Sequence, residues 1–382
     1  GEADVFGSPD CVSKWALENF QQLEAKLSGA RRLARLSELK RWTEDWLREH
    51  RELLKARKND GFIRECHGDL HLGNITEIEG DVVLFDGIEF NDEIRWIDVI
   101  NEMAFLFSDF EHRGAQGLGW VALNRYLEIT GDYAGLELFA FYRLYRLMVR
   151  AKIDSLRLAQ VGLDQTEREE LESEVEVYLE QGEAVTGLGT PLLVLMRGLS
   201  GSGKSYISSR LIGELQAVRI RSDVERKRSN AAEPRAASGS TLMQGLYSSA
   251  ELARSYARLA EIATSIIEGG ENVIVDAAFL NQAERIRFRE LARKLQVPLV
   301  IVSCRGTMRE LNRRIAERMR VATDASQADH AVLEHQMATA DPLTEDELAA
   351  TLFVETGDAE QVSAFIGRLR TELLTDVPGP AQ

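Results

Sequence analysis

Eight residues starting at Gly198 read Gly-Leu-Ser-Gly-Ser-Gly-Lys-Ser, a complete G-x-x-x-x-G-K-[ST] pattern. The pattern directly follows the apolar run Leu192–Met196, which predicts a strand leading into a loop. Glycines let backbone N–H groups turn toward phosphates, and a helix beginning near Lys204 adds its positive N-terminal end. We therefore predict an ATP site in which Lys204 reaches the β- and γ-phosphates and the Ser205 hydroxyl coordinates Mg²⁺. The predicted phosphate-binding residues are Gly198, Ser200, Gly201, Ser202, Gly203, Lys204 and Ser205.

Two aspartates follow short apolar runs further along the chain. Asp223 comes after Ala217–Ile220, and Asp276 closes Asn272–Val275. Ligands of open parallel sheets bind beyond the carboxyl ends of the strands, so both side chains are expected beside the phosphate loop. Phosphoryl transfer to a hydroxyl requires a carboxylate near the acceptor and Mg²⁺ on the phosphates. We assign acceptor orientation or proton acceptance to Asp223 and a metal contact to Asp276; either aspartate could instead cap the next helix.

Arginines gather in the predicted helix Met308–Arg320, directly before a segment with the character of a hinge. Within this helix, Arg314 and Arg318 are the candidates for stabilising the charge of a transferred phosphoryl group. The other arginines of the helix fit a solvated face. Residues Val321–Asp329 are predicted to form a lid hinge, and Ser229–Ser240 a mobile loop.

The first half of the chain carries a second pattern with the chemistry of a kinase. Residues His67–Asn74 read His-Gly-Asp-Leu-His-Leu-Gly-Asn and match H-x-D-x-x-x-x-N, the spacing of a catalytic loop. A predicted hairpin over residues 75–85 then leads to Asp86. In such an arrangement Asp69 accepts the proton of a hydroxyl, while Asn74 and Asp86 hold Mg²⁺.

Apolar spacing predicts the elements that position these side chains. Helical spacing dominates the first half, whereas short apolar runs alternate with helical segments after the turn-rich stretch Gln181–Pro191. This alternation predicts an α/β fold with a five-stranded, mostly parallel sheet covered on both faces. We expect a mainly helical domain over residues 1–182 and a P-loop domain over residues 190–375. The predicted strands of the second domain are Leu192–Met196, Ala217–Ile220, Asn272–Val275, Leu299–Val302 and Leu352–Val354. Its predicted helices are Ser205–Leu215, Leu242–Glu268, Gln282–Leu295, Met308–Arg320 and Ala359–Leu373, and those of the first half include Trp96–Phe107, Trp120–Ile129, Tyr133–Leu158 and Thr166–Leu179.

Composition and charge limit the classes of partner. The 382 residues carry a net charge of −16, nearly all of it in residues 1–183. Nucleic acid and anionic membranes are held mainly through their phosphates, so this charge disfavours both as partners. The sequence has no apolar stretch long enough to span a bilayer and no signal peptide, and its three cysteines form no metal or disulfide pattern. We therefore expect a cytoplasmic protein.

The second half resembles P-loop small-molecule kinases related to gluconate kinase, polynucleotide kinase and zeta-toxin-like kinases. The resemblance covers about residues 190–375 and lies in the P-loop, in Arg221-Ser222-Asp223, in Asp276, and in the arginine-rich helix. It implies ATP-dependent phosphorylation of a hydroxyl on a small molecule.

The first half resembles the C-terminal lobe of aminoglycoside phosphotransferases over about residues 12–180, on the basis of His67–Asn74 and Asp86. Together the halves resemble bifunctional aminoglycoside phosphotransferase/ATP-binding proteins. That family places a β-rich lobe before the catalytic loop, with a lysine and a covering loop for the phosphates. Residues 1–66 show neither strands nor a glycine-rich loop, so we expect this half to bind ATP poorly. It is either a kinase lobe without its partner lobe or a scaffold or acceptor-binding unit.

Three readings of the function follow. The first is an ATP- and Mg²⁺-dependent kinase that works through the P-loop half. The second is a nucleotide-binding regulatory module without turnover. The third is a polynucleotide 5′-hydroxyl kinase, which the charge of −16 disfavours but the nearly neutral second half leaves open. An acidic first half also fits a cationic acceptor such as an aminoglycoside.

Overall fold

The computed structural model describes residues 5–187, 189–232, 249–321 and 330–374. The chain divides into two compact units. Unit 1 comprises residues 1–123 and 135–188, and unit 2 comprises residues 124–134 and 189–382. Unit 2 therefore contains a short segment that precedes the P-loop by more than sixty residues in the sequence.

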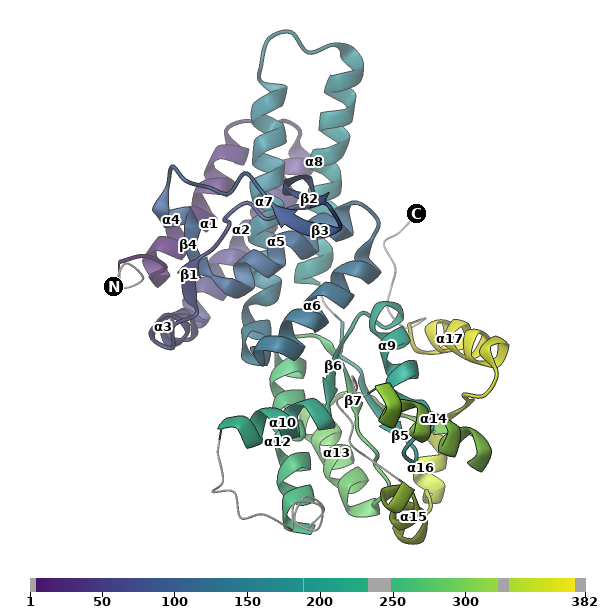
Figure 1. The fold of residues 1–382 in the computed structure, drawn as a ribbon. Coiled ribbons are helices and arrows are strands. Elements are labelled where there is room, and N and C mark those ends of the chain that lie inside the picture. Colours follow the sequence, from purple (N-terminus) through teal and green to yellow (C-terminus); the bar gives the residue numbers. More distant parts are fainter. Residues whose placement is uncertain (1–4, 188, 233–248, 322–329, 375–382) are drawn as a thin grey trace. The chain divides into compact units, whose positions relative to one another are not determined.

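Unit 1 is mainly helical, as its apolar spacing predicts (Figure 1). A hydrophobic core lies where α1, α2, α7 and α8 pack, and includes the buried side chains of Phe20, Leu39, Leu147 and Tyr178. The helices are α1 (Pro9–Glu24), α2 (Ala30–Glu49), α3 (Arg51–Asn59), α4 (Asp92–Arg95), α5 (Val99–His112), the first part of α6 (Gln116–Thr130), α7 (Phe139–Leu158) and α8 (Gln165–Thr186), with 3₁₀ turns at η2 (Leu72–Asn74) and over the last part of η3 (Tyr133–Leu138).

Two short antiparallel sheets interrupt these helices. The predicted hairpin is present as β2 (Ile75–Ile78) and β3 (Asp81–Leu84). The other pair, β1 (Ile63–Glu65) and β4 (Trp96–Asp98), has no counterpart in the prediction.

The helix predicted over Trp96–Phe107 is wrong at its beginning. Residues 96–98 pair with β1, and α5 begins only at Val99, where the Asp98 side chain accepts a hydrogen bond from Ile100 N at 3.0 Å. Asp98 thus caps α5. The helix predicted over Tyr133–Leu158 likewise begins late, because η3 occupies its first six residues.

Unit 2 contains the predicted five-stranded parallel sheet, in the order β6-β7-β5-β8-β9. Strand β5 lies in the centre, so the loop that follows it leaves the sheet between two neighbours, β7 and β8. The class is α/β. The strands are β5 (Leu193–Arg197), β6 (Ala217–Arg221), β7 (Asn272–Asp276), β8 (Leu299–Arg305) and β9 (Thr351–Glu355).

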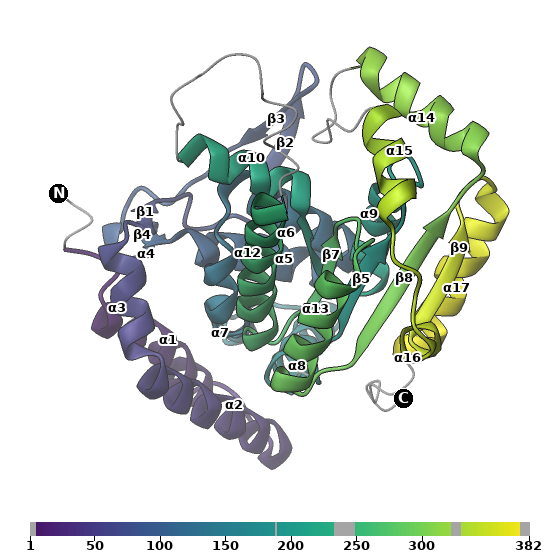
Figure 2. The same cartoon turned by 90° about the horizontal axis from the view of Figure 1, so that it is seen from below.

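Helices cover both faces of this sheet (Figures 1 and 2). On one face, α9 (Lys204–Glu214) and α17 (Ala359–Leu374) pack against alternate strand residues such as Val194 and Met196. On the other face lie α12 (Ser249–Glu268) and α13 (Gln282–Leu295). A sheet buried on both faces explains why its strands read as continuous apolar runs in the sequence.

Three helices of unit 2 were not predicted: α10 (Ser222–Ala232), α15 (His330–Thr339) and α16 (Glu345–Ala349). The first of them shows that the predicted Ser229–Ser240 loop is wrong at its start, because residues 229–232 are helical. The rest of that loop lies outside the described residues. The predicted lid hinge Val321–Asp329 also lies outside them, except for Val321, the last residue of α14 (Met308–Val321).

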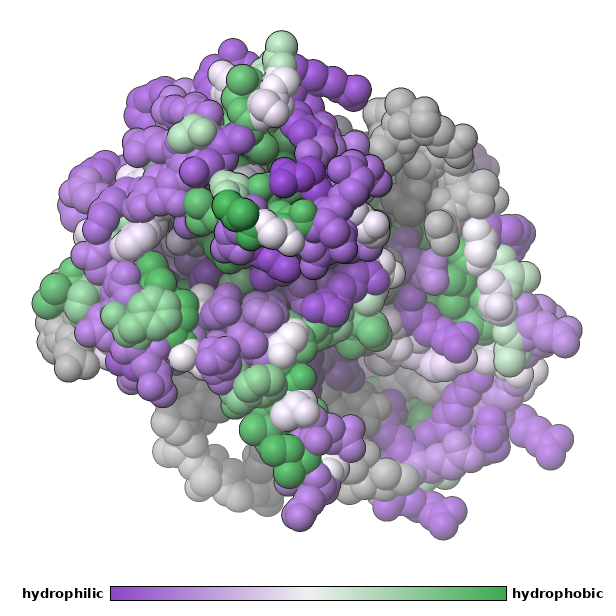
Figure 3. Space-filling model, turned by 90° about the horizontal axis from the view of Figure 1, so that it is seen from above, coloured by the Kyte–Doolittle hydropathy of each residue, from purple (hydrophilic) through white to green (hydrophobic). Residues whose placement is uncertain are grey.

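Hydrophilic residues cover most of the face seen in Figure 3, with small separate hydrophobic patches. Among the described residues, no helix combines the length and the apolar character needed to cross a bilayer.

Candidate active site

The P-loop connects the centre of the sheet to helix α9 and requires glycine at two positions. Gly201 and Gly203 have φ values of +80° and +88°, in the left-handed region. A Cβ at Gly203 would lie 3.0 Å from Thr356 Cβ, and one at Gly201 would lie 2.8 Å from Leu311 O. Glycine at these two positions therefore permits a tight turn, whereas a side chain at either one would clash with its neighbours. The turn opens onto the N-terminus of α9, the end of a helix that attracts phosphates.

Lys204 lies folded against the loop that precedes it. Its Nζ donates to Gly198 O and to Leu199 O, each at 2.9 Å. Burial lowers the pKa of Lys204, and the nearby carboxylate of Asp276 opposes that shift. A lysine held by carbonyls in this way can exchange them for phosphate oxygens, which are stronger acceptors for an ammonium group.

A cavity of about 640 Å³ extends from the P-loop across the carboxyl ends of the strands. It brings together Lys204 and Ser205 with both strand-end aspartates, Asp223 and Asp276. Of the phosphate-binding residues predicted from the motif, Ser200, Gly201, Gly203, Lys204 and Ser205 line this cavity, whereas Gly198 and Ser202 lie behind the loop surface.

Asp276 lies at the end of β7 with one oxygen already engaged. Ser208 Oγ donates to Asp276 Oδ2 at 2.9 Å, and both residues are buried. Within the described residues Oδ1 has no hydrogen-bond partner. Asp276 and Ser205 both line the cavity. Over the described part of the chain, no three His, Cys, Asp or Glu side chains form a ready-made metal site. One hydroxyl and one carboxylate nevertheless suit Mg²⁺, which usually takes few protein ligands and completes its shell with water and substrate phosphates.

Asp223 stands in the first turn of α10, on the other side of the cavity. Its Oδ1 accepts from Arg226 Nη2 at 2.6 Å, in a pair that is about one-quarter exposed on each side. The second oxygen, Oδ2, makes no hydrogen bond to any described residue. A carboxylate held at one oxygen and open at the other can receive a proton from a hydroxyl placed beside it.

The two candidate arginines of α14 have different surroundings, although both line the cavity. Arg314 donates to Thr356 O at 2.6 Å, to Thr356 Oγ1 at 2.7 Å and to Gly201 O at 3.2 Å, so its guanidinium joins α14 to the P-loop and to the end of β9. Arg318 lies close enough to Lys204 to contribute to the lowered pKa of that lysine. Arg314 is thus engaged by the P-loop and by Thr356, while Arg318 is the second arginine of α14 in the lining of the cavity.

The walls of the cavity away from the P-loop come from helices that the motifs did not reveal. On α12, Glu251 and Tyr256 line it, and on α13 Glu284 does so. Burial raises the pKa of Glu284, which favours its protonated form as a hydrogen-bond donor. On α15, Gln336 Oε1 accepts from Ser200 N at 2.8 Å, directly on the phosphate loop. The only sequence signal for α12 is its spacing, since residues 251, 252, 255 and 256 share one helical face.

The catalytic-loop pattern of unit 1 forms a separate cluster around Asp69 and Asn74. Asn74 Nδ2 donates to Asp69 O at 3.0 Å and lies 3.3 Å from Asp69 Oδ2. His71 Nε2 lies 3.5 Å from the same carboxylate oxygen. Asp86 is exposed and follows Phe85, whose N–H bonds Asn74 O at 3.1 Å. The structure thus joins Asp69 to Asn74 directly, while Asp86 adjoins them only through the backbone.

Buried charges from two helices support this loop from behind. The Glu102 carboxylate accepts from Gly68 N at 3.1 and 3.2 Å, and Arg146 Nη1 donates to Gly68 O at 2.9 Å. Burial raises the pKa of Glu102, and Arg146 opposes that shift. Leu72 N donates to Asp109 Oδ2 at 2.8 Å. These contacts fix the backbone of residues 68–72, and none of them was predicted.

Part of unit 2 matches a known protein family. Residues 193–343 match a family described as "AAA domain". The chain is also 30% identical over 289 residues to uncharacterized proteins of Mycobacterium bovis and Mycobacterium tuberculosis. That match covers 75% of this chain and 57% of each relative, so the chain spans about half the length of the curated relatives it matches.

Among solved structures, the chain is similar to a gluconokinase from Sinorhizobium meliloti 1021, with 22% identity, 48% of this chain and 96% of the other covered, and a TM-score of 0.36. A putative kinase from Chloroflexus aurantiacus is 21% identical; the match covers 49% of this chain and 98% of that kinase, with a TM-score of 0.39. The APS kinase CysC of Mycobacterium tuberculosis, in complex with AMPPNP and APS, is 22% identical; the match covers 47% of this chain and 98% of CysC, with a TM-score of 0.35.

Proposed function

We propose that unit 2 is an ATP- and Mg²⁺-dependent kinase that phosphorylates a hydroxyl of a small molecule. The observation that carries this proposal is the 640 Å³ cavity, which holds the P-loop lysine, two strand-end carboxylates and an arginine around one space. Pure nucleotide binding requires only the P-loop side of that space. The walls from α12, α13 and α15 supply polar groups where a second substrate would lie.

Each residue has a distinct task in this reaction. The acceptor hydroxyl gives its proton to Asp223, its oxygen forms a bond to the γ-phosphorus of ATP, and the bond between that phosphorus and the β–γ bridging oxygen breaks. Lys204 and the P-loop N–H groups hold the phosphates, and Arg318 stabilises charge on the transferred group. Ser205 and Asp276 would hold Mg²⁺, whose charge neutralises the phosphate oxygens.

The test separates binding from transfer. The protein is incubated with γ-labelled ATP, Mg²⁺ and a metabolite extract, while nucleotide affinity is measured with a fluorescent ATP analogue. Lys204→Ala is expected to lose both binding and transfer. Asp223→Asn is expected to keep the affinity and to lower transfer by about 10²–10⁴-fold, the usual contribution of a general base. Lys294→Ala and Asp346→Asn, which change exposed groups of the same unit outside the cavity, serve as matched controls.

Two outcomes would favour the other readings. Transfer that is unchanged in Asp223→Asn, or ATP binding without transfer to any extract component, would favour a regulatory module. Transfer to a 5′-hydroxyl oligonucleotide that weakens steeply with salt would favour a polynucleotide kinase.

A second candidate function belongs to unit 1. We propose that His67–Asn74 is a catalytic loop in which Asp69 acts as base and Asn74 and Asp86 hold Mg²⁺. Its support is the direct contact of Asn74 with Asp69 and the buried charges that fix the loop. In a Lys204→Ala background, transfer of label to an aminoglycoside should fall to background when Asp69 is changed to Asn. If Lys204→Ala alone shows no such transfer, this proposal is rejected.

A further inference from the structure

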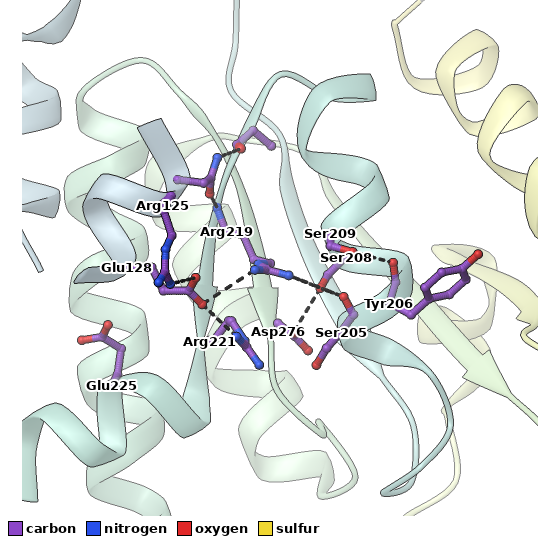
Figure 4. A network of polar contacts seen from close by, with 12 residues as sticks. Arg125, Glu128, Ser205, Tyr206, Ser208, Ser209, Arg219, Arg221, Glu225 and Asp276 are labelled. Carbon is purple, nitrogen blue, oxygen red and sulfur yellow. Dashed lines mark hydrogen bonds and ion pairs between the residues drawn. The ribbon is translucent and has the colours of Figure 1, made fainter. Parts of the chain in front are cut away.

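Residues 124–134, which precede the P-loop domain in the sequence, belong to unit 2 and lie along its edge strand β6. Asn124 attaches this segment to the strand. Its Nδ2 donates to Ala217 O at 2.9 Å, and its Oδ1 accepts from Arg219 N at 2.6 Å. One side-chain amide thus bonds two backbone groups of β6, in the way that a neighbouring strand would. Figure 4 shows the end of α6, which carries Arg125 and Glu128, beside β6. The segment thus covers a sheet edge that would otherwise be exposed.

One turn further along α6, Glu128 faces two arginines of the strand. Its Oε1 lies 2.9 Å from Arg221 Nη1 and 3.7 Å from Arg219 Nη2. The Glu128 side chain is 14% exposed, Arg219 12% and Arg221 19%. A third arginine, Arg125, approaches the other oxygen only at 3.9 Å and is 70% exposed. Glu128 is therefore the counter-charge of two largely buried guanidinium groups.

These two arginines connect Glu128 to both sides of the active-site cavity. Arg221 lines the cavity, two residues before Asp223. The side chain of Arg219 extends the other way along the sheet, and its Nη1 lies 3.4 Å from Ser208 Oγ and 3.5 Å from Ser205 O. Ser208 in turn donates to Asp276 Oδ2 at 2.9 Å. Figure 4 shows this row of side chains from Glu128 through Arg219 to Ser208, with Asp276 beneath.

Glu128 and Asp276, the proposed metal ligand, share Arg219 as a positively charged neighbour. The Arg219 guanidinium lies between two carboxylates, because its Nη2 is 3.7 Å from Glu128 Oε1 while its Nη1 donates to Ser208 Oγ, which in turn donates to Asp276 Oδ2. If Glu128 lost its charge, Arg219 would keep Asp276 as its principal anionic neighbour. A guanidinium drawn toward that carboxylate would compete with Mg²⁺ for it.

We propose that Glu128 is a positioning residue of the kinase site, which supplies a second carboxylate to Arg219 and Arg221 and so keeps the carboxylate of Asp276 available for Mg²⁺. The inference rests on the proposed function for the reaction itself, but its central consequence is a metal affinity. That affinity can be measured without turnover.

The test measures Mn²⁺ binding by electron paramagnetic resonance on the full chain, in the presence of a non-hydrolysable ATP analogue, together with nucleotide affinity in EDTA. Glu128→Gln is expected to weaken Mn²⁺ binding by on the order of tenfold, the effect typical of losing a partner behind a metal ligand. Nucleotide affinity in EDTA should stay within about twofold, because the P-loop itself is unchanged. Glu261→Gln, which changes a carboxylate on α12 that is 68% exposed, is the matched control.

Two further variants distinguish positioning from simple loss of structure. Glu128→Asp keeps the charge and should recover most of the Mn²⁺ affinity. Glu128→Gln combined with Arg219→Gln removes the competing guanidinium and should bind Mn²⁺ more tightly than Glu128→Gln alone, whereas a purely structural role predicts a further loss. Unchanged Mn²⁺ affinity in Glu128→Gln, or a double variant that binds no better than the single one, overturns the inference. Failure of the kinase proposal would show separately, as absence of transfer in the unmodified protein with this Mn²⁺ pattern intact.

Discussion

Arg285, on helix α13, holds the loop after β7 in place at one wall of the cavity in unit 2. The side chains of Arg285 and Glu347 are completely buried, and Arg285 Nε lies 2.9 Å from Glu347 Oε1. The remaining guanidinium N–H groups donate to Phe279 O at 3.1 Å, Leu280 O at 2.9 Å and Pro342 O at 2.8 Å. One side chain thus fixes the loop after β7, which includes the cavity residue Leu280.

Arg285→Met fills a similar volume but leaves one carboxylate and three carbonyls without their donor. Removing one partner of a buried ion pair costs about 3–5 kcal/mol. The orphaned carbonyls add to this, so we expect a loss of at least about 4 kcal/mol from the free energy of unfolding of unit 2. With a urea dependence of about 2–3 kcal/mol/M, the unfolding midpoint should fall by roughly 1.5–2 M.

The assay is urea unfolding followed by far-ultraviolet circular dichroism and by tryptophan fluorescence in parallel. All tryptophans lie in unit 1, at positions 15, 42, 46, 96 and 120, so fluorescence follows unit 1 while circular dichroism follows the helices of both units. Arg289→Met is the matched control on the same helix, because its ion pair with Asp346 is 3.8 Å long and exposed and should contribute less than about 1 kcal/mol.

A second variant removes the orphaned charge. Arg285→Met combined with Glu347→Leu should recover part of the lost stability, because an uncharged pair leaves only the carbonyls unsatisfied. The reasoning is refuted if Arg285→Met lowers the midpoint by no more than Arg289→Met does, or if the double variant is no more stable than Arg285→Met.

Three further predictions concern stability, strain and thiol chemistry. Burial raises the pKa of Glu347, but its hydrogen bonds with Arg285 and Thr344 outweigh burial and lower the pKa overall. The stability that this carboxylate contributes is therefore present above its unfolded pKa and is lost as the pH falls through the lower folded pKa. Urea unfolding from pH 7 to pH 3 should show that loss, and the Glu347→Leu variant should lack this pH dependence. Gly203→Ala forces a side chain to φ +88° with its Cβ 3.0 Å from Thr356 Cβ, and should lower the free energy of unfolding by about 1–2 kcal/mol in the same assay and weaken nucleotide binding. Burial raises the pKa of the Cys66 and Cys304 thiols to about 12. A timed titration with a disulfide reagent at pH 8, in native buffer and in urea, should show that buried Cys304 reacts only at the rate of unfolding and that Cys66, which is partly exposed, reacts more slowly than a free thiol.

The strands and the phosphate loop of unit 2 could be predicted because their signals are local. A parallel strand buried on both faces is a short apolar run, and a P-loop is a fixed pattern of glycines and lysine. Both features are complete within a few residues, so Asp223 and Asp276 could be placed at strand ends without knowledge of any distant contact.

Apolar spacing did not predict helix α10, because a charged residue of this helix, Glu225, is buried. Glu225 is 3% exposed and accepts from Tyr133 OH at 3.2 Å, and it also pairs with Arg228. A search for apolar periodicity treats such a residue as part of a solvated loop. The partner that makes the burial possible lies 92 residues away in the sequence.

Sequence spacing likewise could not choose between Arg314 and Arg318. Residues four apart share one face of a helix, so both guanidinium groups were expected to reach the phosphates. Thr356, 42 residues further along, engages Arg314 through its hydroxyl and its carbonyl, so the two arginines differ in their partners although both line the cavity. Glu128 acts on β6 in a comparable way from 93 residues before Arg221. A local pattern therefore identifies which residue types are present at the site, while contacts between distant segments determine which partners each side chain has.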